Sequence, residues 1–153
     1  MKQFLLGALM LFFLCYCTNE CSLLPSNTNV LLISIIQKDS IGNLFRSSAS
    51  GLKIEYENGL PLNRSQQGKF YCHLPISQKQ ITIVVTDSSG LLSRVHISFQ
   101  AQSKIVPPNC GMYFAVSDIS AKLKENSLLD SLKVVNHRIL PKDTSSHLLL
   151  FMK

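Results

Sequence analysis

The chain has 153 residues, a formal net charge of +6 and a hydrophobic fraction of 46%. This is enough for one domain with a sizeable core. The basic residues are scattered, not interleaved with aromatic side chains along one stripe, so nucleic acid is excluded as the expected partner, and the charge excess indicates only mild attraction to an anionic membrane surface.

The first residues have the pattern of an export signal. Lys2 is followed by an uncharged apolar run over residues 4–14. That run is too short to cross a bilayer core, which needs about 20 apolar residues, but it fits the apolar region of a secretory signal peptide. Residues 1–16 are therefore predicted to be a signal peptide, with a buried core helix as the alternative.

The apolar run ends in cysteine and lacks the small residues that signal peptidase prefers. Leu14 lies three residues before Cys17, which resembles a bacterial lipoprotein signal. Tyr16 replaces the small residue usual at that position, so Cys15 is the fallback site and plain secretion the alternative. We predict lipid attachment at Cys17, which would give stable membrane anchoring, and a lipidated tether over residues 17–29.

After the tether, the chain reads as short strands. Residues 30–36 form an apolar, β-branched run typical of a strand buried on both faces. Residues 52–57 and 70–74 alternate between apolar and polar side chains, with a turn expected at Asn58-Gly59. Residues 81–99 give the clearest hairpin, whose apolar side chains alternate on both sides of a turn at residues 87–90.

The C-terminal part continues this pattern, with residues 112–116, 132–135 and 147–152 as strands and residues 120–127 as the one helical turn. About eight short strands separated by turns predict that residues 30–153 form a single antiparallel β-sandwich, immunoglobulin-like, with an open barrel as the alternative. The predicted core includes apolar positions that alternate along the strands: Ile54, Ile81, Ile83, Val95, Ile97, Phe99 and Phe114.

No catalytic residue, metal site or cofactor is predicted. The sequence has no nucleophile elbow and no glycine-rich phosphate loop. Cys72 lies between Phe70 and Leu74 on an apolar face, so a small core residue is the better interpretation than a nucleophile. The four histidines have no spacing typical of a metal site: His73, His96, His137 and His147.

Several short motifs resemble a family of small cell-envelope lipoproteins from Bacteroidota. They are Cys21 four residues after Cys17, the strand at residues 30–36 that runs into Lys38-Asp39, and the segments at residues 109–114 and 130–136. The resemblance implies an envelope lipoprotein and carries over no catalytic residue. Lipoproteins of that phylum at the cell surface often carry an acidic run after the acylated cysteine, but here Glu20 is the one acid in residues 18–20. Cys17 is followed by Thr18 and not by the aspartate that is associated with inner-membrane retention. Both points imply the outer membrane, with the domain facing the periplasm.

Three classes of function follow as hypotheses. The favoured one is an outer-membrane-anchored, non-enzymatic lipoprotein whose sandwich binds another envelope protein through a strand edge or a cluster of loops. The alternative is a module that binds glycan or peptidoglycan, which Tyr56, Tyr71 and Tyr113 on one shared outer face would favour. A hydrolase is the third, and no pair of nucleophile and base suggests it.

We also predict a disulfide between Cys21 and Cys110. Disulfides persist in the oxidising environment to which the signal would send the chain. Cys15 leaves with the signal and Cys17 takes the lipid, while Cys72 has a core position. The remaining pair would close a loop of about 90 residues and stabilise the fold by up to about 4–5 kcal/mol. The alternatives are three unpaired thiols, or a bond from Cys72 to either partner.

Peptide mapping under non-reducing conditions checks this pairing. We expect one linked species that contains Cys21 and Cys110, and its disappearance after reduction. A free Cys21 peptide, or one linked to Cys72, would contradict the assignment.

Overall fold

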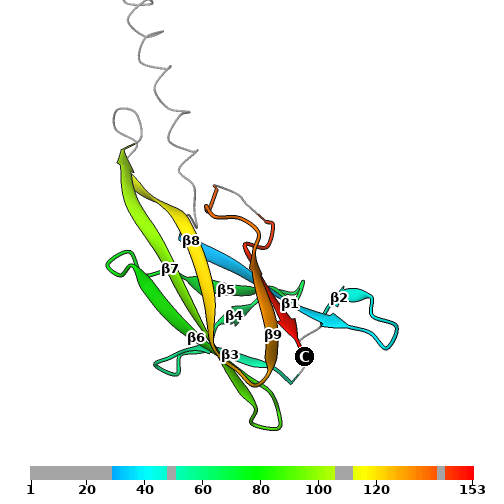
Figure 1. Ribbon diagram of the computed structural model, residues 1–153. Coiled ribbons are helices and arrows are strands. Elements are labelled where there is room, and N and C mark those ends of the chain that lie inside the picture. The colour runs from blue at the N-terminus through cyan, green and yellow to red at the C-terminus, as the bar shows by residue number, and fades with distance from the viewer. Residues whose placement is uncertain (1–28, 48–50, 106–111, 141–143) are drawn as a thin grey trace, which may run out of the picture.

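The computed structural model describes residues 29–47, 51–105, 112–140 and 144–153. In these ranges the chain forms ten strands and no helix, and the strands make two sheets that pack face to face as a β-sandwich (Figure 1). The strands are β1 Val30–Lys38, β2 Leu44–Arg46, β3 Lys53–Tyr56, β4 Asn63–Arg64, β5 Phe70–His73, β6 Gln80–Thr86, β7 Leu92–Ile105, β8 Met112–Asn126, β9 Leu129–Val134 and β10 Leu148–Met152. The predicted all-β sandwich is confirmed.

The first sheet has the order β4-β5-β1-β10-β9, and β2 pairs with the far end of β1. β1 is central and its first six residues are buried on both faces, as predicted. Leu31, Ile33 and Ile35 belong to the core between the sheets, whereas Leu32 and Ser34 alternate with them and are buried too. Over residues 30–35, β1 thus exposes at most 7% of any residue, and the small exposed parts of Val30 and Leu32 lie on the outer face of the sheet.

One strand pair departs from the predicted antiparallel arrangement. β1 and β10 are parallel, with Ile33 opposite Leu148 and Ile36 opposite Phe151. The two strands come from opposite ends of the described chain, so no short turn fixes their relative direction, and a sequence pattern carries no information about it. Between the predicted strands at residues 30–36 and 52–57, the chain also forms the short strand β2.

The second sheet has the order β3-β6-β7-β8, and all its pairs are antiparallel. β6 and β7 form the predicted hairpin, in which Ile81 is opposite Ile97 and Ile83 is opposite Val95. Their apolar side chains fill the core, while Thr82 and His96 lie on the outer face. Six of the seven predicted core residues are buried: Ile54, Ile81, Ile83, Val95, Ile97 and Phe99.

A buried serine holds the connection between the sheets at the β8–β9 turn. The Ser93 Oγ accepts hydrogen bonds from the backbone N–H groups of Leu128 and Leu129, each 3.0 Å long. Leu128 and Leu129 are themselves buried in the core. Ser93 thereby satisfies two backbone donors that would otherwise be desolvated without a partner, which matters because such a loss costs about 1–3 kcal/mol per group.

The predicted helical turn at residues 120–127 is wrong, because residues 120–126 continue β8 and Ser127 lies in the bend that follows. Asp118 has a φ of 54°, and the register of β7 and β8 shifts between Ser98 and Gln100. The extra residue is a β-bulge, which changes which side chains face inward. Val116 and Ile119 are therefore both buried although they lie three residues apart.

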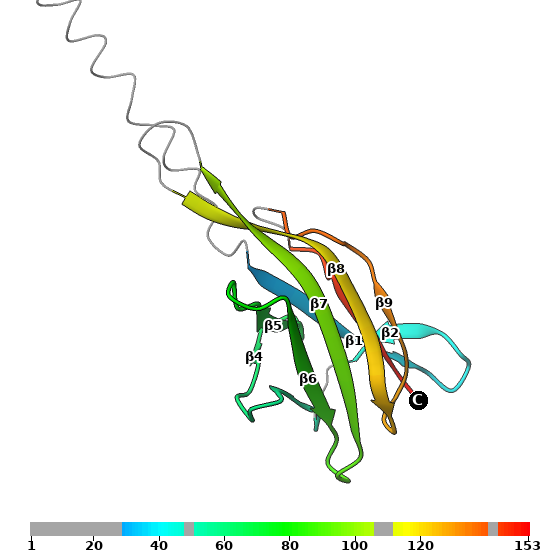
Figure 2. The ribbon, with the colours of Figure 1, turned by 60° about the vertical axis from the view of Figure 1, so that its left-hand side comes forward.

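Beyond the bulge, β7 and β8 continue as a two-stranded ribbon that projects from the sandwich, and we call residues 100–105 with residues 112–117 the arm (Figure 2). No second sheet covers the outer part of the arm, so Phe114 is only half-buried, which corrects its predicted place in the core. Ile105 and Met112, opposite each other, are 87% and 58% exposed.

The strand register can be checked by a pair of neighbouring substitutions. Ile97→Ala should lower the free energy of unfolding by about 2–5 kcal/mol, because the side chain is 0% exposed and its loss leaves a cavity. His96→Ala should cost less than about 1 kcal/mol, since the imidazole is on the outer face. Urea unfolding measures both, and equal losses would contradict the register.

Candidate binding groove

The residues predicted for covalent attachment lie outside the described part of the chain. Cys17, the predicted lipid site, and Cys21 and Cys110, the predicted disulfide, all fall in residues that the structure does not describe. The same holds for the signal peptide over residues 1–16. These assignments stay predictions.

Cys72 occupies the core position that the sequence indicated. It carries a free thiol, is 0% exposed and lies within hydrogen-bonding reach of the Tyr56 hydroxyl. Burial raises the pKa of the Cys72 thiol to about 12, from an ordinary value of 9.0. A thiol that stays protonated at neutral pH is a poor nucleophile, so Cys72 acts as a small apolar side chain.

A groove of about 920 Å³ lies on the outer face of the first sheet. Its floor is the outward side of β1 and β5, where Val30, Leu32 and Tyr71 lie. β4 and the turn before β5 form one side, and the segment between β9 and β10 forms the other, with Ile139 and Leu140. We call this feature the sheet groove.

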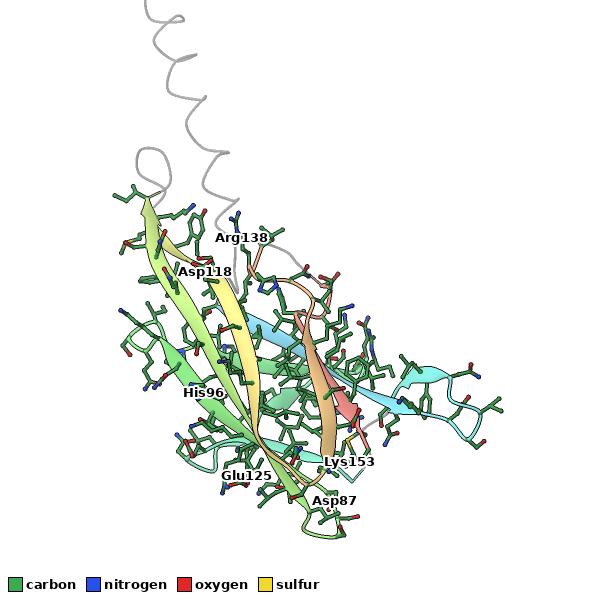
Figure 3. The ribbon with its side chains drawn as sticks, in the orientation of Figure 1. Asp87, His96, Asp118, Glu125, Arg138 and Lys153 are labelled. Atoms are coloured by element: carbon green, nitrogen blue, oxygen red, sulfur yellow. The ribbon has the colours of Figure 1, made fainter. Side chains whose placement is uncertain are left out.

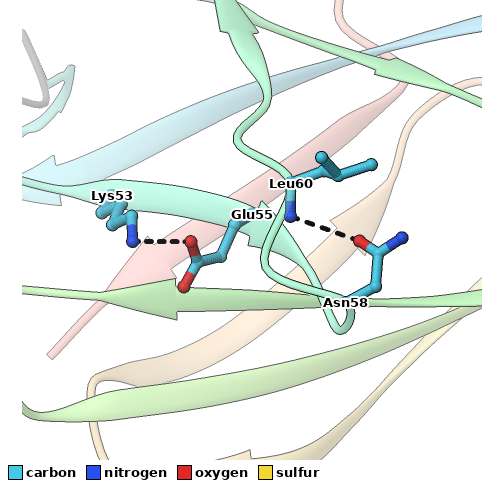
Figure 4. A network of polar contacts seen from close by, with 4 residues as sticks. All are labelled: Lys53, Glu55, Asn58 and Leu60. Atoms are coloured by element: carbon cyan, nitrogen blue, oxygen red, sulfur yellow. Dashed lines mark hydrogen bonds and ion pairs between the residues drawn. The ribbon is translucent and has the colours of Figure 1, made fainter.

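A bonded turn places β4 at the rim of the sheet groove. Asn58 Oδ1 accepts a hydrogen bond from the Leu60 N–H at 3.2 Å, and Gly59 has the positive φ of 84° that the turn requires (Figure 4). Leu62 then donates its N–H to the Ile54 oxygen at 2.9 Å. The chain crosses here from β3 in the second sheet to β4 in the first.

On the sheet edge next to this turn, Lys53 and Glu55 form an ion pair with a distance of 2.7 Å between Nζ and Oε2 (Figure 4). Both residues lie on one face of β3, because side chains two apart in a strand share a face. The Lys53 side chain is 66% exposed, so the pair contributes little to stability. Charged residues on a free strand edge do discourage pairing with other chains.

The opposite side of the sheet groove is fixed by contacts across the chain. Lys69 Nζ donates a hydrogen bond to the backbone oxygen of Thr144. Val135 donates its N–H to the His147 oxygen at 2.8 Å, which closes the segment between β9 and β10 into a loop. Ile139 is buried and donates its N–H to the Val116 oxygen, 3.0 Å away.

The chemistry of the sheet groove is apolar at the centre and polar or basic around it. Arg64 and Lys69 supply cations, and the Arg64 guanidinium lies 5.7 Å from the centre of the Phe70 ring. Side-chain amides come from Asn63, Gln66 and Gln67. Among the lining residues that the structure describes, none is acidic. This surface suits a ligand with apolar groups and acidic or hydrogen-bonding groups.

A second hollow, of about 800 Å³, borders the outer face of the second sheet and includes His73 and His96. The His96 ring is tied into a cross-strand ladder, with Nε2 at 3.2 Å from Gln80 Oε1 and Nδ1 at 3.4 Å from Thr82 Oγ1. Since the amide oxygen only accepts, Nε2 carries the proton and Nδ1 accepts from the threonine. The residues that line this second hollow include both Glu57 and Lys124, so the hollow favours neither an anionic nor a cationic ligand.

The tyrosines do not share an outer face. Tyr71 is 37% exposed in the sheet groove on the first sheet. Tyr56 packs against the core of the second sheet and exchanges hydrogen bonds with the backbone of His73, donating to its oxygen at 3.0 Å and accepting from its N–H at 2.7 Å. Tyr113 lies on the arm. The stacking platform that would favour a glycan ligand is therefore reduced to one ring.

Sequence reasoning did not find the sheet groove. Its floor comes from Val30, Leu32, Tyr71 and His73, one side from side chains of Asn63 to Lys69, and the other from Ile139, Leu140 and Thr144. No local motif joins segments so far apart in the chain. The only available signal was the continuous apolar run at residues 30–36, which is typical of a strand buried on both faces. Such a strand implies that other parts of the chain cover both of its faces.

No protein-family model, curated protein or solved structure significantly matches the chain. Within the described ranges, no three His, Cys, Asp or Glu side chains are placed to hold a metal ion. In the same part of the chain, no helix has the length and apolar character to cross a membrane.

The buried thiol predicts a pH dependence. The folded-state pKa of Cys72 is raised to about 12, from an ordinary value of 9.0. The unfolded chain therefore loses this proton first, so stability should be unaffected below about pH 9 and should fall as pH rises from about 9 to 12. The pKa of Tyr56 is also raised by burial and acts in the same direction at higher pH.

Urea unfolding at a series of pH values measures this effect. Cys72→Ala should lose the part of the alkaline destabilisation that begins near pH 9 and should keep, at higher pH, only the part that burial of Tyr56 causes, because contacts with Cys72 also raise the Tyr56 pKa. An identical pH dependence in the two proteins would contradict the assignment.

Proposed function

We propose that this protein is a lipid-anchored cell-envelope protein, attached to the outer membrane through Cys17 and facing the periplasm. In this proposal its β-sandwich is a non-enzymatic module that binds a segment of another envelope protein in the sheet groove. The N-terminal sequence pattern supports the anchoring. The shape and composition of the sheet groove support the binding.

The observation that carries the binding proposal is the pairing of an aliphatic floor with a basic and amide-rich rim. Val30 and Leu32 form the floor, and Arg64 and Lys69 stand beside it. An extended polypeptide with alternating side chains can place apolar groups on such a floor and acidic or polar groups on its rim. The short edge strand β4 borders the sheet groove and offers backbone groups to such a segment.

A non-enzymatic role is supported by the positions of the reactive side chains. The described cysteine is buried with a raised pKa. The hydroxyl–imidazole contact between Thr82 and His96 is 3.4 Å long and belongs to a cross-strand ladder on the outer face. Cross-strand polar pairs of this kind are ordinary elements of a solvated sheet face.

Recovery of partners from detergent-solubilised membranes tests the proposal, with the tagged full chain as bait. Arg64→Glu should remove most of the recovered partner, because it reverses one rim charge of the sheet groove. Lys122→Glu makes the same charge change on β8, far from that groove, and should leave recovery unchanged. Circular dichroism and urea unfolding should confirm that both variants are folded.

Two results would contradict the protein-binding proposal. Equal recovery with the two variants would place the partner elsewhere. Co-sedimentation of the bait with purified peptidoglycan, lost in Arg64→Glu while no protein is recovered, would instead favour the glycan-binding alternative.

A further inference from the structure

The arm and the start of β1 lie toward the same end of the molecule. In both ribbon views, β7 and β8 extend past the beginning of β1 on that side (Figures 1 and 2). β1 begins at Val30, directly after the predicted tether. A tether of about 12 residues reaches at most about 40 Å, so the start of β1 would lie within that distance of the membrane.

The side chains of the arm change in polarity along its length. Its last described pair is apolar, with Ile105 opposite Met112 at 87% and 58% exposure. The next pair is Lys104 opposite Tyr113. An exposed apolar pair followed by lysine and tyrosine is the order that suits insertion into a bilayer interface, where aromatic rings and lysine ammonium groups lie at headgroup level.

The arm end of the domain carries two exposed cations that suit an anionic headgroup surface. Lys104 lies on the arm itself. Arg138 lies toward the same end, together with Asp118 at the base of the arm (Figure 3). The opposite end also carries both signs, with Lys153 near Asp87 and Glu125 (Figure 3), so the orientation rests on the apolar pair and on the tether.

We propose that the arm is a membrane-contacting element that inserts Ile105 and Met112 into the interface of the bilayer to which the chain is anchored. This inference rests on the proposed lipid anchor for its orientation. The arm continues about 20 Å beyond the bulge, since six strand residues rise about 3.4 Å each. It would act as a second contact beside the lipid and would fix how the sheet groove is presented.

A second exposed isoleucine, in another hairpin of the molecule, serves as a matched control. The β1–β2 hairpin exposes Ile41 to 82%, much like Ile105. Hydrogen bonds from the N–H groups of Ile41 and Asn43 to Asp39 Oδ1, at 3.0 and 2.7 Å, hold its turn. This tip follows the far end of β1, about 30 Å along the strand from Val30, so the proposed orientation keeps it away from the bilayer.

The chain contains no tryptophan, so a single introduced one reports on its own surroundings. The full-length Ile105→Trp and Ile41→Trp proteins are reconstituted into vesicles of phosphatidylethanolamine and phosphatidylglycerol with brominated acyl chains. Ile105→Trp should show a blue shift and a loss of emission relative to unbrominated vesicles. Ile41→Trp should show neither and should be quenched by aqueous iodide.

Quenching by lipid at both positions, at neither, or only at residue 41 would overturn the inference. The mass of the N-terminal peptide, measured on the same samples, reports separately on the anchor. An acylated Cys17 peptide without lipid quenching at residue 105 refutes the arm contact and leaves the proposed anchoring intact. Lipid quenching at residue 105 without acylation supports the arm contact and refutes the anchor.

Discussion

The burial of β1 on both faces is the constraint on which the rest of the structure depends. A strand in this position must satisfy its polar groups inside the protein. The Leu32 N–H donates to His147 Nδ1 at 3.1 Å, and the His147 N–H donates to the Leu32 oxygen at 2.8 Å. Ser34 and Ser146 join their hydroxyl groups at 2.6 Å. These contacts dock the C-terminal end of the chain against its first strand and bring β10 into the sheet.

The same docking creates the outer surface that the proposed function uses. The loop between β9 and β10 returns over the first sheet, and its Ile139 and Leu140 form one side of the sheet groove. The other side depends on the crossing from β3 to β4, held by the backbone bond between Leu62 and Ile54. The sides of the sheet groove are thus the same connections that close the sandwich. The shape of the groove therefore depends on the hydrogen bonds that hold those connections in place.

The bulge at Asp118 divides β8 into two parts with different surroundings. On one side, Ile119 packs in the core, and its N–H donates to the His137 oxygen at 3.1 Å. On the other side of the bulge, β8 extends beyond the first sheet and forms one half of the arm. An aspartate tolerates the left-handed backbone there better than a branched side chain would. One inserted residue therefore gives the protein both its core register and its projecting element.

The sequence by itself determined the β class, the two-faced character of residues 30–36, the β6–β7 hairpin and most of the core, including Cys72. These features depend on side-chain alternation, which is local and has a fixed period. Only the tertiary structure decided the parallel pairing of β1 with β10, the bulge at Asp118 and the sheet groove. Each of these features joins segments far apart in the chain or shifts the alternation of side chains by one residue. An alternating pattern specifies which face a side chain takes, but it does not specify which strand will lie beside it.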